Sequence, residues 1–555
     1  MDESLQVLLA HRDRWAALDA PGRLAILEAV ERGLHGVADR WVAAGLVAKH
    51  IPPATIGEGE EWGQLAALFH ALRQLKQSMR EIARFGQPRI PGPLYTRPDG
   101  RVIARVFPRM FPDRMLQPRV TGEVWMPEGV TEAEVRRTQA WAYKAVGAEG
   151  QVALVLGAGN SSMLPVADAL HKLFVEGQVV LLKMNPVNAY LGPFMEEALR
   201  PLTGPGYLRL VRGGADQGAY LCRHPAVDEI HMTGSAKTYE AIVFGPGEEG
   251  RIRKEQRRPL INRPVTAELG NVTPVIVVPG PWSDREVNGW AGRIASWFVN
   301  NAGFNCLTPR VIIQHKAWPQ REALLKALGR KLSNVATRRA YYPGAAERHR
   351  AFLAAHPEAR VFGTPREGHL PWTLVADANP ERRDDPCFTT EAFCSLCAET
   401  ALDAGDAVEF IDRAVAFAND ALWGTLAAAI IVHPRSLADP RIAEAMDRAI
   451  ANLRYGMICV NIPASEAYFA GTVPWGGCPG RSERDIQSGT GWTNNPLMFR
   501  RPQKSVVRGP FAPFIDPLGV TSKRPHEAGR RLACFEAKPS AGRLVRLAWS
   551  VLRTL

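Results

Sequence analysis

Short apolar runs alternate with helical segments from residue 151 onward, and this alternation restricts the folds open to the chain. Val152–Leu156 is an unbroken apolar run, a helical pattern follows as far as Glu176, and Val179–Lys183 is a second apolar run. The alternation continues through Leu208–Val211 and Glu229–Met232. Strands separated by helices of this length favour a parallel, doubly wound sheet.

A second unit of the same kind follows the first. Val275–Val278 and Val311–Gln314 are predicted strands, and Arg285–Asn300 between them is a predicted helix. Further strands are expected at 427–432 and 458–461. The sequence therefore predicts an α/β fold with two successive α/β units.

Helices and a β-hairpin are predicted before this α/β region. Residues 4–50 and 60–86 carry apolar side chains at helical spacing. A proline-rich stretch ends the helices, and two β-like segments follow at Arg101–Phe107 and Val120–Met126. We expect the helices to pack on the outside of a larger domain.

Composition narrows the class of protein. The 555 residues are 46% hydrophobic, enough to bury several cores. The eight cysteines are scattered, which favours free thiols over disulfides. Cys394 and Cys397 form a lone CxxC without a second ligand pair, so no metal site is predicted.

Charge and hydropathy bear on the partners and the location of the protein. The net charge is +12, but the basic residues are spread out and no nucleic-acid-binding module is recognisable, so no nucleic acid partner is expected. The N-terminus, Met-Asp-Glu-Ser, lacks the basic region of a signal peptide. No apolar run reaches the roughly 18 residues needed to span a bilayer. We therefore expect a cytoplasmic protein.

The basic residues are densest near the C-terminus, where a final helix is predicted. On a helical projection the polar residues fall within a sector of roughly 100°, and apolar residues fill the rest. The sector comprises Arg543, Arg546, Ser550, Arg553 and Thr554. Residues 540–555 are therefore expected either to contact an anionic membrane peripherally or to dock on the protein's own body or a second subunit.

One thiol and one carboxylate stand in turns rich in glycine and asparagine. Glu268-Leu-Gly-Asn271 precedes Asn300-Asn-Ala-Gly-Phe-Asn-Cys306. A thiolate is the reactive form of cysteine, and a turn rich in N–H donors lowers its pKa and holds an oxyanion. The pair is typical of a nucleophile and its base. Taken singly, a buried inert cysteine and a surface carboxylate are the better interpretations of the two residues.

Two other turns join a strand to a helix. They are Gly157-Ala-Gly-Asn160 and Thr233-Gly-Ser235. A helix N-terminus presents free N–H groups to an anion or oxyanion. A plain strand-to-helix turn is an equally good interpretation of each motif alone.

The order of these motifs resembles the aldehyde dehydrogenase superfamily. The matching motifs cover about residues 150 to 500: Gly159-Asn160, Val180–Lys183, Thr233-Gly-Ser235, Glu268-Leu-Gly270, Gly303–Cys306, Glu391-Ala-Phe393, Ala418-Asn419 with Gly424–Ala428, Val460-Asn461 and Pro474–Gly477. The resemblance implies a Rossmann-like cofactor domain, an α/β catalytic domain and a small β extension that builds homodimers or homotetramers.

The resemblance also divides the chain into segments. These are 1–95, N-terminal helices packed on the cofactor domain; 96–128, a β-hairpin and candidate oligomerisation arm; 129–266, the dinucleotide-binding domain; 267–462, the catalytic domain; 463–515, a return to the cofactor domain with an oligomerisation strand; and 516–555, a basic tail with an amphipathic helix.

Roles for individual residues follow from the same resemblance. Cys306 would attack an aldehyde carbon, and the side-chain amide of Asn160 with the backbone N–H of Cys306 would hold the oxyanion. Glu268 would activate the water that hydrolyses the thioester. The implied cofactor is NAD or NADP. Residues that would contact it are Lys183, Gly234, Ser235, Glu391 and Phe393.

Three positions depart from the family pattern. Pro186 stands where many NAD-using members have a glutamate that binds the ribose, so NAD and NADP both remain open. Tyr239 stands where the cofactor-helix motif usually ends in glycine, which suggests a reshaped pyrophosphate loop. Asn271 replaces the second glycine of Glu-Leu-Gly-Gly.

Three functions are compatible with this pattern. The first is NAD(P)-dependent oxidation of an aldehyde to a carboxylic acid through a cysteine thioester. The second is a CoA-dependent acylating dehydrogenase or acyl reductase, and Glu268 argues against it because many such enzymes lack this base. The third is a non-catalytic binding protein of the same fold, and the joint presence of Cys306, Glu268 and Asn160 argues against it.

Overall fold

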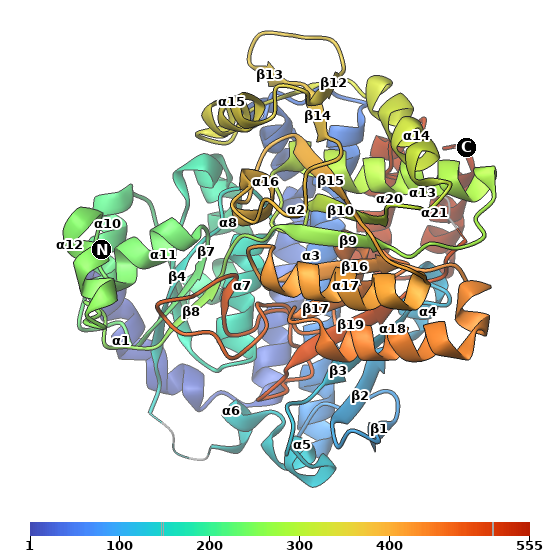
Figure 1. Cartoon of the computed structure of the whole chain (residues 1–555). Helices are drawn as coiled ribbons and strands as arrows, with labels where there is room; N and C mark the ends of the chain where they lie inside the picture. Colours follow the sequence, from blue (N-terminus) through green and yellow to red (C-terminus); the bar gives the residue numbers. More distant parts are fainter. Residues whose placement is uncertain (146, 148, 513–515, 555) are drawn as a thin grey trace.

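The computed structural model describes residues 1–145, 147, 149–512 and 516–554. The other residues fall within the predicted segments 129–266, 463–515 and 516–555 and lie outside the described residues. Two large sheets organise the described chain, and the long helix α3 (Ile56–Phe85) passes through the middle of the molecule (Figure 1).

The first sheet has six strands in the order β18-β8-β7-β4-β5-β6. Its strands are β4 (Val152–Leu156), β5 (Val179–Lys183), β6 (Leu208–Val211), β7 (Glu229–Thr233), β8 (Val265–Glu268) and β18 (Gly489–Thr490). The first five are parallel, and β18 pairs antiparallel with β8. Strand order reverses at β4, as in doubly wound nucleotide-binding sheets. The predicted parallel sheet is confirmed.

Helices connect these strands. They are α7 (Leu164–Phe174), η1 (Pro186–Leu191), α8 (Gly192–Ala198), α9 (Arg200–Thr203), α10 (Ala215–Arg223), α11 (Ala236–Val243) and α12 (Gly247–Glu255). Such crossover helices cover the faces of a parallel sheet, which explains why the central strands β4 and β5 are almost entirely apolar.

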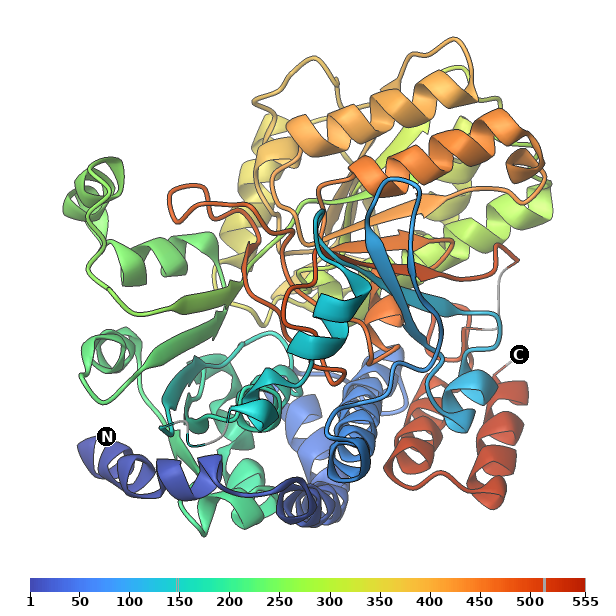
Figure 2. The ribbon, with the colours of Figure 1, turned by 90° about the horizontal axis from the view of Figure 1, so that it is seen from below.

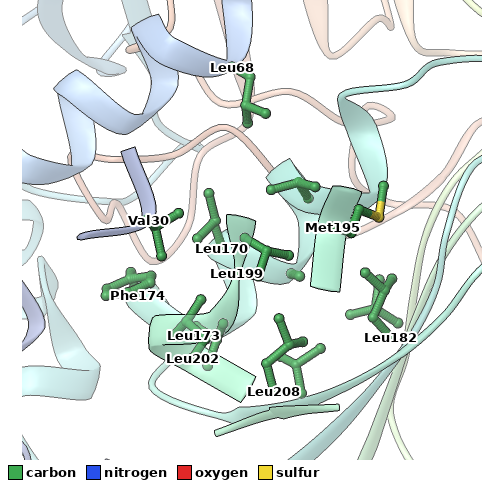
Figure 3. Packing of buried hydrophobic residues seen from close by; sticks show 14 of the residues in the cluster. Val30, Leu68, Leu170, Leu173, Phe174, Leu182, Met195, Leu199, Leu202 and Leu208 are labelled. Carbon is green, nitrogen blue, oxygen red and sulfur yellow. The ribbon is translucent and has the colours of Figure 1, made fainter. Parts of the chain in front are cut away.

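The N-terminal helices pack against this sheet and its helices. Helix α1 (Asp2–Ala16) contacts β4, β5 and β6, while α2 (Ala20–Ala48) contacts α8, α9 and α3. Figure 3 shows part of the resulting core, a single cluster that contains Val30 of α2, Leu68 of α3, Leu173 of α7 and Leu182 of β5. The helical patterns predicted for 4–50 and 60–86 therefore mark faces that are buried against the sheet layer.

The second sheet has eleven strands in the order β1-β2-β3-β19-β17-β16-β9-β10-β15-β14-β12. Its strands are β1 (Leu94–Thr96), β2 (Val102–Phe107), β3 (Thr121–Trp125), β9 (Thr273–Val277), β10 (Pro309–His315), β12 (Arg360–Phe362), β14 (Trp372–Val375), β15 (Leu396–Leu402), β16 (Ala427–Ile431), β17 (Met457–Val460) and β19 (Lys504–Arg508). The strands from β19 to β14 are parallel.

Helices cover both faces of this parallel part. Val275 and Val277 belong to the core on the side of α13 (Asp284–Val299) and α14 (Arg321–Ser333). Ile276 and Val278 belong to the core on the side of α17 (Ala407–Asp420) and α18 (Pro440–Asn452). Successive strand residues point to opposite faces, so a strand buried on both faces is apolar throughout.

The predicted β-hairpin is part of this sheet. Strands β2 and β3 pair antiparallel, β3 pairs with β19, and β19 pairs in parallel with β17 of the same chain. The hairpin is thus joined by backbone hydrogen bonds to the strands that follow Cys306. Assembly into homodimers or homotetramers stays a prediction.

The remaining elements are shorter or lie at the C-terminus. They are α4 (Phe111–Leu116), α5 (Glu132–Thr138), α6 (Trp141–Lys144), η2 (Asn300–Gly303), the pair β11 (Arg338–Arg339) and β13 (His369–Leu370), α15 (Ala345–Ala355), α16 (Pro386–Thr389), η3 (Ser436–Ala438), α19 (Ala464–Tyr468), α20 (Pro525–Ala537) and α21 (Ala541–Leu552). None of the described helices is both long and apolar enough to cross a bilayer.

The C-terminal helix forms as predicted, but its polar sector does not coincide with its exposed face. Ser550 and Thr554 are buried, and their hydroxyls donate to the carbonyls of Leu547 and Val551 within the helix. Trp549 is instead exposed. A short hydroxyl side chain can satisfy itself on its own helix, so it tolerates burial where arginine does not.

Candidate active site

Two cavities of the structure meet at three of the predicted catalytic residues. The first has a volume of about 1070 Å³ and lies along the carboxyl ends of the six-stranded sheet. The second, of about 710 Å³, lies between α3, α13 and the C-terminal helices. Asn160, Glu268 and Cys306 line both cavities. A molecule in either cavity can therefore reach the Cys306 sulfur.

Cys306 and Glu268 are in direct contact. Glu268 is the last residue of β8, and Cys306 follows η2 and precedes β10. The thiol Sγ donates to Glu268 Oε1 at 2.9 Å, leaving Oε2 without a close hydrogen-bond partner among the described residues. Burial raises the pKa of Glu268 to about 7. Burial, and then the neighbouring carboxylate, raise the pKa of the Cys306 thiol well above its ordinary value.

The backbone of the turn before Cys306 is unusual. Asn301 and Ala302 have φ of 50° and 55°, in the left-handed region that residues other than glycine rarely adopt. Gly303 has φ of 78°, and a Cβ there would lie 2.5 Å from the Cys394 carbonyl oxygen. The turn therefore depends on neighbours that hold it in place.

Asn160 is bound into this turn. Its Nδ2 donates to the Phe304 carbonyl at 2.8 Å, and its own carbonyl accepts from Asn301 Nδ2 at 2.8 Å. The hydroxyl of Tyr341 also lies 3.0 Å from that carbonyl. One of the two amide hydrogens of Asn160 is thus used to position the side chain beside Cys306.

The predicted cofactor residues all line the first cavity. Lys183 lies at the end of β5, with Nζ donating to the Gly213 carbonyl at 2.8 Å. Gly234 and Ser235 lie at the N-terminus of α11, where the Ser235 hydroxyl accepts the N–H of Thr238. Free N–H groups at a helix N-terminus can bind an anion, and this helix end borders the first cavity.

Glu391 and Phe393 line the same cavity near Cys306. Glu391 Oε1 accepts the N–H of Asn271 at 3.1 Å, and burial raises its pKa to about 7. A Cβ on Gly270 would lie 2.0 Å from Glu391 Oε2, so the glycine of Glu-Leu-Gly makes room for this carboxylate. Phe393 packs edge-on against Tyr342, with ring centroids 4.9 Å apart.

The three departures from the family pattern have structural counterparts. Tyr239 is buried with Met232 and Phe244 in a small core under α11 and does not line the first cavity. Asn271 joins two strands, because its Nδ2 donates to the Ala427 carbonyl and its Oδ1 accepts from Leu426 N. Pro186 begins η1, leaving Asn185 as the cavity-lining residue beyond Lys183.

Sequence reasoning missed several residues that hold the site. Glu60 of α3 accepts the N–H of Asn301 and pairs with Arg338, and Lys49 pairs with Glu61 in a fully buried contact. The sequence does indicate that Glu61 is buried, because Glu61 lies in the apolar stripe that continues through Leu65, Leu68 and Leu72 at helical spacing. A carboxylate in such a stripe is buried and needs a cation.

One cluster of potential metal ligands lies outside both cavities. Among the described residues, His356, Asp385 and Cys387 bring ligand atoms within 4.8 Å of one another. His356 Nε2 is 2.9 Å from Asp385 Oδ1, which also accepts the N–H of Cys387. Hydrogen bonding accounts for the cluster, so it carries no metal proposal.

Sequence comparison finds relatives over part of the chain. Residues 133–343 match the model of the aldehyde dehydrogenase family. The 4-trimethylaminobutyraldehyde dehydrogenase of Homo sapiens is 33% identical over 132 residues, 23% of this chain and 23% of its own length. The 4-trimethylaminobutyraldehyde dehydrogenase A of Danio rerio is 26% identical over 146 residues, 26% of each chain. The aligned stretches thus span about a quarter of these curated relatives.

Solved structures match almost the whole chain in fold. A mutant of aldehyde dehydrogenase C from Pseudomonas syringae, solved with NAD+ and octanal, has a TM-score of 0.62 at 15% identity and covers 92% of this chain and 89% of its own. The NADP-dependent glyceraldehyde-3-phosphate dehydrogenase of Bacillus halodurans, solved with NADP, has a TM-score of 0.61 at 16% identity and covers 91% and 90%. The match to the aldehyde dehydrogenase family covers residues 133–343, less than half of the chain, and at such identity the likeness over the whole chain is one of fold.

Proposed function

We propose that this protein oxidises an aldehyde to a carboxylic acid, with NAD or NADP as the hydride acceptor. The observation that carries the proposal is the meeting of two cavities at Cys306, Glu268 and Asn160. Such a reaction needs one space for the cofactor and another for the aldehyde, with the nucleophile between them.

The first half of the reaction uses the contact between Cys306 and Glu268. Sγ attacks the carbonyl carbon of the aldehyde while the thiol proton passes to Glu268 Oε1, 2.9 Å away. The product is a thiohemiacetal whose oxygen carries the developing negative charge. The remaining amide hydrogen of Asn160 and the N–H of Cys306 are the donors proposed to hold this oxygen.

The first cavity has the features that a dinucleotide needs. It runs from the N-terminus of α11 and Lys183 to Glu391 and Cys306, and it is large enough for a dinucleotide. Lys183 and Ser235 would hold the adenosine and pyrophosphate half, and Glu391 and Phe393 the nicotinamide half. When bound there, the nicotinamide supplies the hydride acceptor. Two structural relatives bind NAD+ or NADP in their solved structures.

The second half of the reaction releases the acyl group from Cys306. Loss of a hydride from the thiohemiacetal carbon to the nicotinamide would leave a thioester on Sγ, and Glu268 must pass the thiol proton to solvent before it acts again. Water then attacks the thioester carbon and gives a proton to Glu268, and the C–S bond breaks to release the carboxylic acid and the Cys306 thiolate. A carboxylate whose pKa is about 7 takes this proton more readily than an exposed glutamate, because a base works best when its pKa lies near the working pH. Transfer to coenzyme A would not need this base.

A cofactor titration with an aldehyde panel tests the proposal. The purified protein is mixed with NAD or NADP and aldehydes of increasing chain length, and both NAD(P)H and the organic product are measured. We expect one carboxylate for each NAD(P)H. Formation of an acyl-CoA only when coenzyme A is present, or no NAD(P)H with either cofactor, would contradict the proposal.

A further inference from the structure

The C-terminal helix α21 forms one wall of the second cavity. The residues of α21 that line the cavity are Leu544, Leu547, Ala548, Val551 and Leu552. These positions follow the i, i+3, i+4, i+7, i+8 spacing of one helix face. One face of α21 therefore lines the cavity that ends at Cys306.

The mouth of this cavity lies between α4 and α21. Met115 of α4 and Leu552 of α21 both line the cavity, yet they are 45% and 59% exposed. A residue that lines a cavity and also faces solvent lies at its opening. Both views place α4 beside the C-terminal helices (Figures 1 and 2).

Large apolar side chains are exposed on the two helices that form this mouth. Phe111 of α4 is 71% exposed, and Val545 and Trp549 of α21 are 67% and 63% exposed. Single exposed apolar residues are ordinary on protein surfaces. Together with Met115 and Leu552, which line the opening, five large apolar side chains are exposed on these two helices. Such a gathering of exposed apolar side chains marks an interaction surface.

The same two helices carry basic side chains. Arg114 of α4 and Arg546 of α21 are exposed and form no ion pair with any described residue. Arg553 lies 3.8 Å from Glu527, a carboxylate already bound to Arg524 at 2.8 Å. The one carboxylate of α4, Asp113, is buried. The exposed surface of α4 and α21 thus combines apolar side chains with positive charge that no described carboxylate neutralises fully.

A buried ion cluster fixes α4 and α20 to α3. Arg73 of α3 lies 3.0 Å from Asp113 of α4 and 2.5 Å from Glu536 of α20. All three side chains are buried. Helix α20 packs on both α3 and α21, so the two sides of the mouth share one support.

We propose that this exposed surface, the rim, docks on an anionic lipid bilayer and that long-chain aldehydes pass from the bilayer through the mouth to Cys306. The rim consists of the exposed side chains of Phe111, Arg114, Met115, Val545, Arg546, Trp549, Leu552 and Arg553. The proposal deepens the proposed function by naming its substrate class. Apolar side chains enter the boundary between headgroups and acyl chains, while arginines bind anionic headgroups. A second copy docked through the same rim would bring arginines against arginines.

Vesicle cosedimentation of the full-length protein tests the docking step. Vesicles are made of phosphatidylcholine with or without phosphatidylserine. We expect binding only when phosphatidylserine is present. The double variant Val545→Ser/Trp549→Ser should bind at least about tenfold more weakly. The double variant Arg114→Gln/Arg546→Gln should bind about thirtyfold more weakly, since each arginine near an anionic surface contributes roughly a factor of five.

Two matched controls lie away from the rim. Val361 is 50% exposed, and Arg350 has a side chain that is 74% exposed. Val361→Ser and Arg350→Gln should leave vesicle binding unchanged. Unchanged vesicle binding by the rim variants would overturn the proposal. The proposal would also fail if the rim variants changed only the sedimentation coefficient of the protein in the absence of vesicles, because that result would identify the rim as a contact between copies of the chain.

An activity comparison separates this proposal from the catalytic one. With a long-chain aldehyde presented in anionic vesicles, kcat/KM of the Val545→Ser/Trp549→Ser variant should fall about tenfold. With a short, water-soluble aldehyde it should equal that of the unchanged protein. Equal losses with both aldehydes would contradict delivery through the rim. If the unchanged protein oxidises no aldehyde but still binds the vesicles through the rim, the catalytic proposal fails and the docking proposal stands.

Discussion

The backbone N–H of Asn301 donates to Oε2 of Glu60, 3.0 Å away, although 241 residues separate the two in the chain. The same oxygen is 2.6 Å from Arg338 Nη1. Burial raises the pKa of Glu60, and Arg338 opposes that rise. An N-terminal helix thereby fixes the left-handed turn that precedes Cys306.

Removal of the Glu60 carboxylate should weaken both the fold and the site. Glu60→Ala leaves Arg338 without its partner and the Asn301 N–H without its acceptor, so we expect a loss of about 3–5 kcal/mol in the free energy of unfolding. Glu60→Gln keeps an oxygen for the N–H and should retain more activity than Glu60→Ala. Denaturant unfolding and kcat are the measurements.

The ion pair of Arg251 with Glu248 provides a control for this prediction. Both side chains are exposed, at 57% and 68%, so Arg251→Ala should leave the unfolding midpoint unchanged. A Glu60→Ala protein that is as stable and as active as the unchanged protein would show that Glu60 does not hold the turn.

Replacement of Glu268 by glutamine should separate the two halves of the reaction. Glu268→Gln removes the base for thioester hydrolysis, so steady turnover should fall by about a hundredfold or more. A first burst of NAD(P)H should remain but form more slowly, because the thiol is still present while the carboxylate that takes its proton is gone. Rapid-mixing kinetics measure both phases. Full steady turnover in this variant would assign the base to another residue.

The proposed base should appear in the pH dependence of the reaction. Glu268 acts in its ionised form, and burial raises its pKa to about 7. Activity should therefore be low at pH 5, rise as pH increases through about 7 and level off above it. Glu391 also has a pKa raised to about 7. If the rise persists in Glu268→Gln, Glu391 or another group is responsible.

Loss of the Lys183 ammonium should weaken cofactor binding. Lys183 lines the first cavity and is proposed to contact the adenosine half. Lys183→Ala should raise the KM for NAD or NADP by about tenfold, the usual effect of one charged hydrogen bond, with kcat little changed. Lys326→Ala, at an exposed position of α14, is the control. An unchanged KM in Lys183→Ala would place the cofactor elsewhere.

Central strands of both sheets could be predicted because a strand that is buried on both faces has an apolar sequence. Val152–Leu156 and Val179–Lys183 lie between helix layers, so all their residues except Lys183 are apolar, and the two runs match β4 and β5 residue for residue. The approach of Cys306 to Glu268 was expected from the order of motifs, and the structure brings the two together.

Features that depend on distant pairing could not be predicted in this way. The contact of Glu60 with Asn301 requires α3 to pass beside the catalytic turn, and no local pattern in 56–85 indicates that neighbour. The pairing of β3 with β19 joins residues that are far apart in the chain, and a short alternating strand specifies no partner. The exposure of Trp549 depends on which face of α21 lines the second cavity.

The most direct test of the account is the NAD(P)H burst of Cys306→Ala, measured beside Cys534→Ala. Cys306 and Cys534 are the two free cysteines of the described chain that are not fully buried, so Cys534→Ala controls for the loss of an accessible thiol. We predict that Cys306→Ala abolishes aldehyde-dependent NAD(P)H formation, burst and steady phase together, while Cys534→Ala retains both. Undiminished NAD(P)H formation by a folded Cys306→Ala protein would contradict the central claim that Cys306 is the nucleophile.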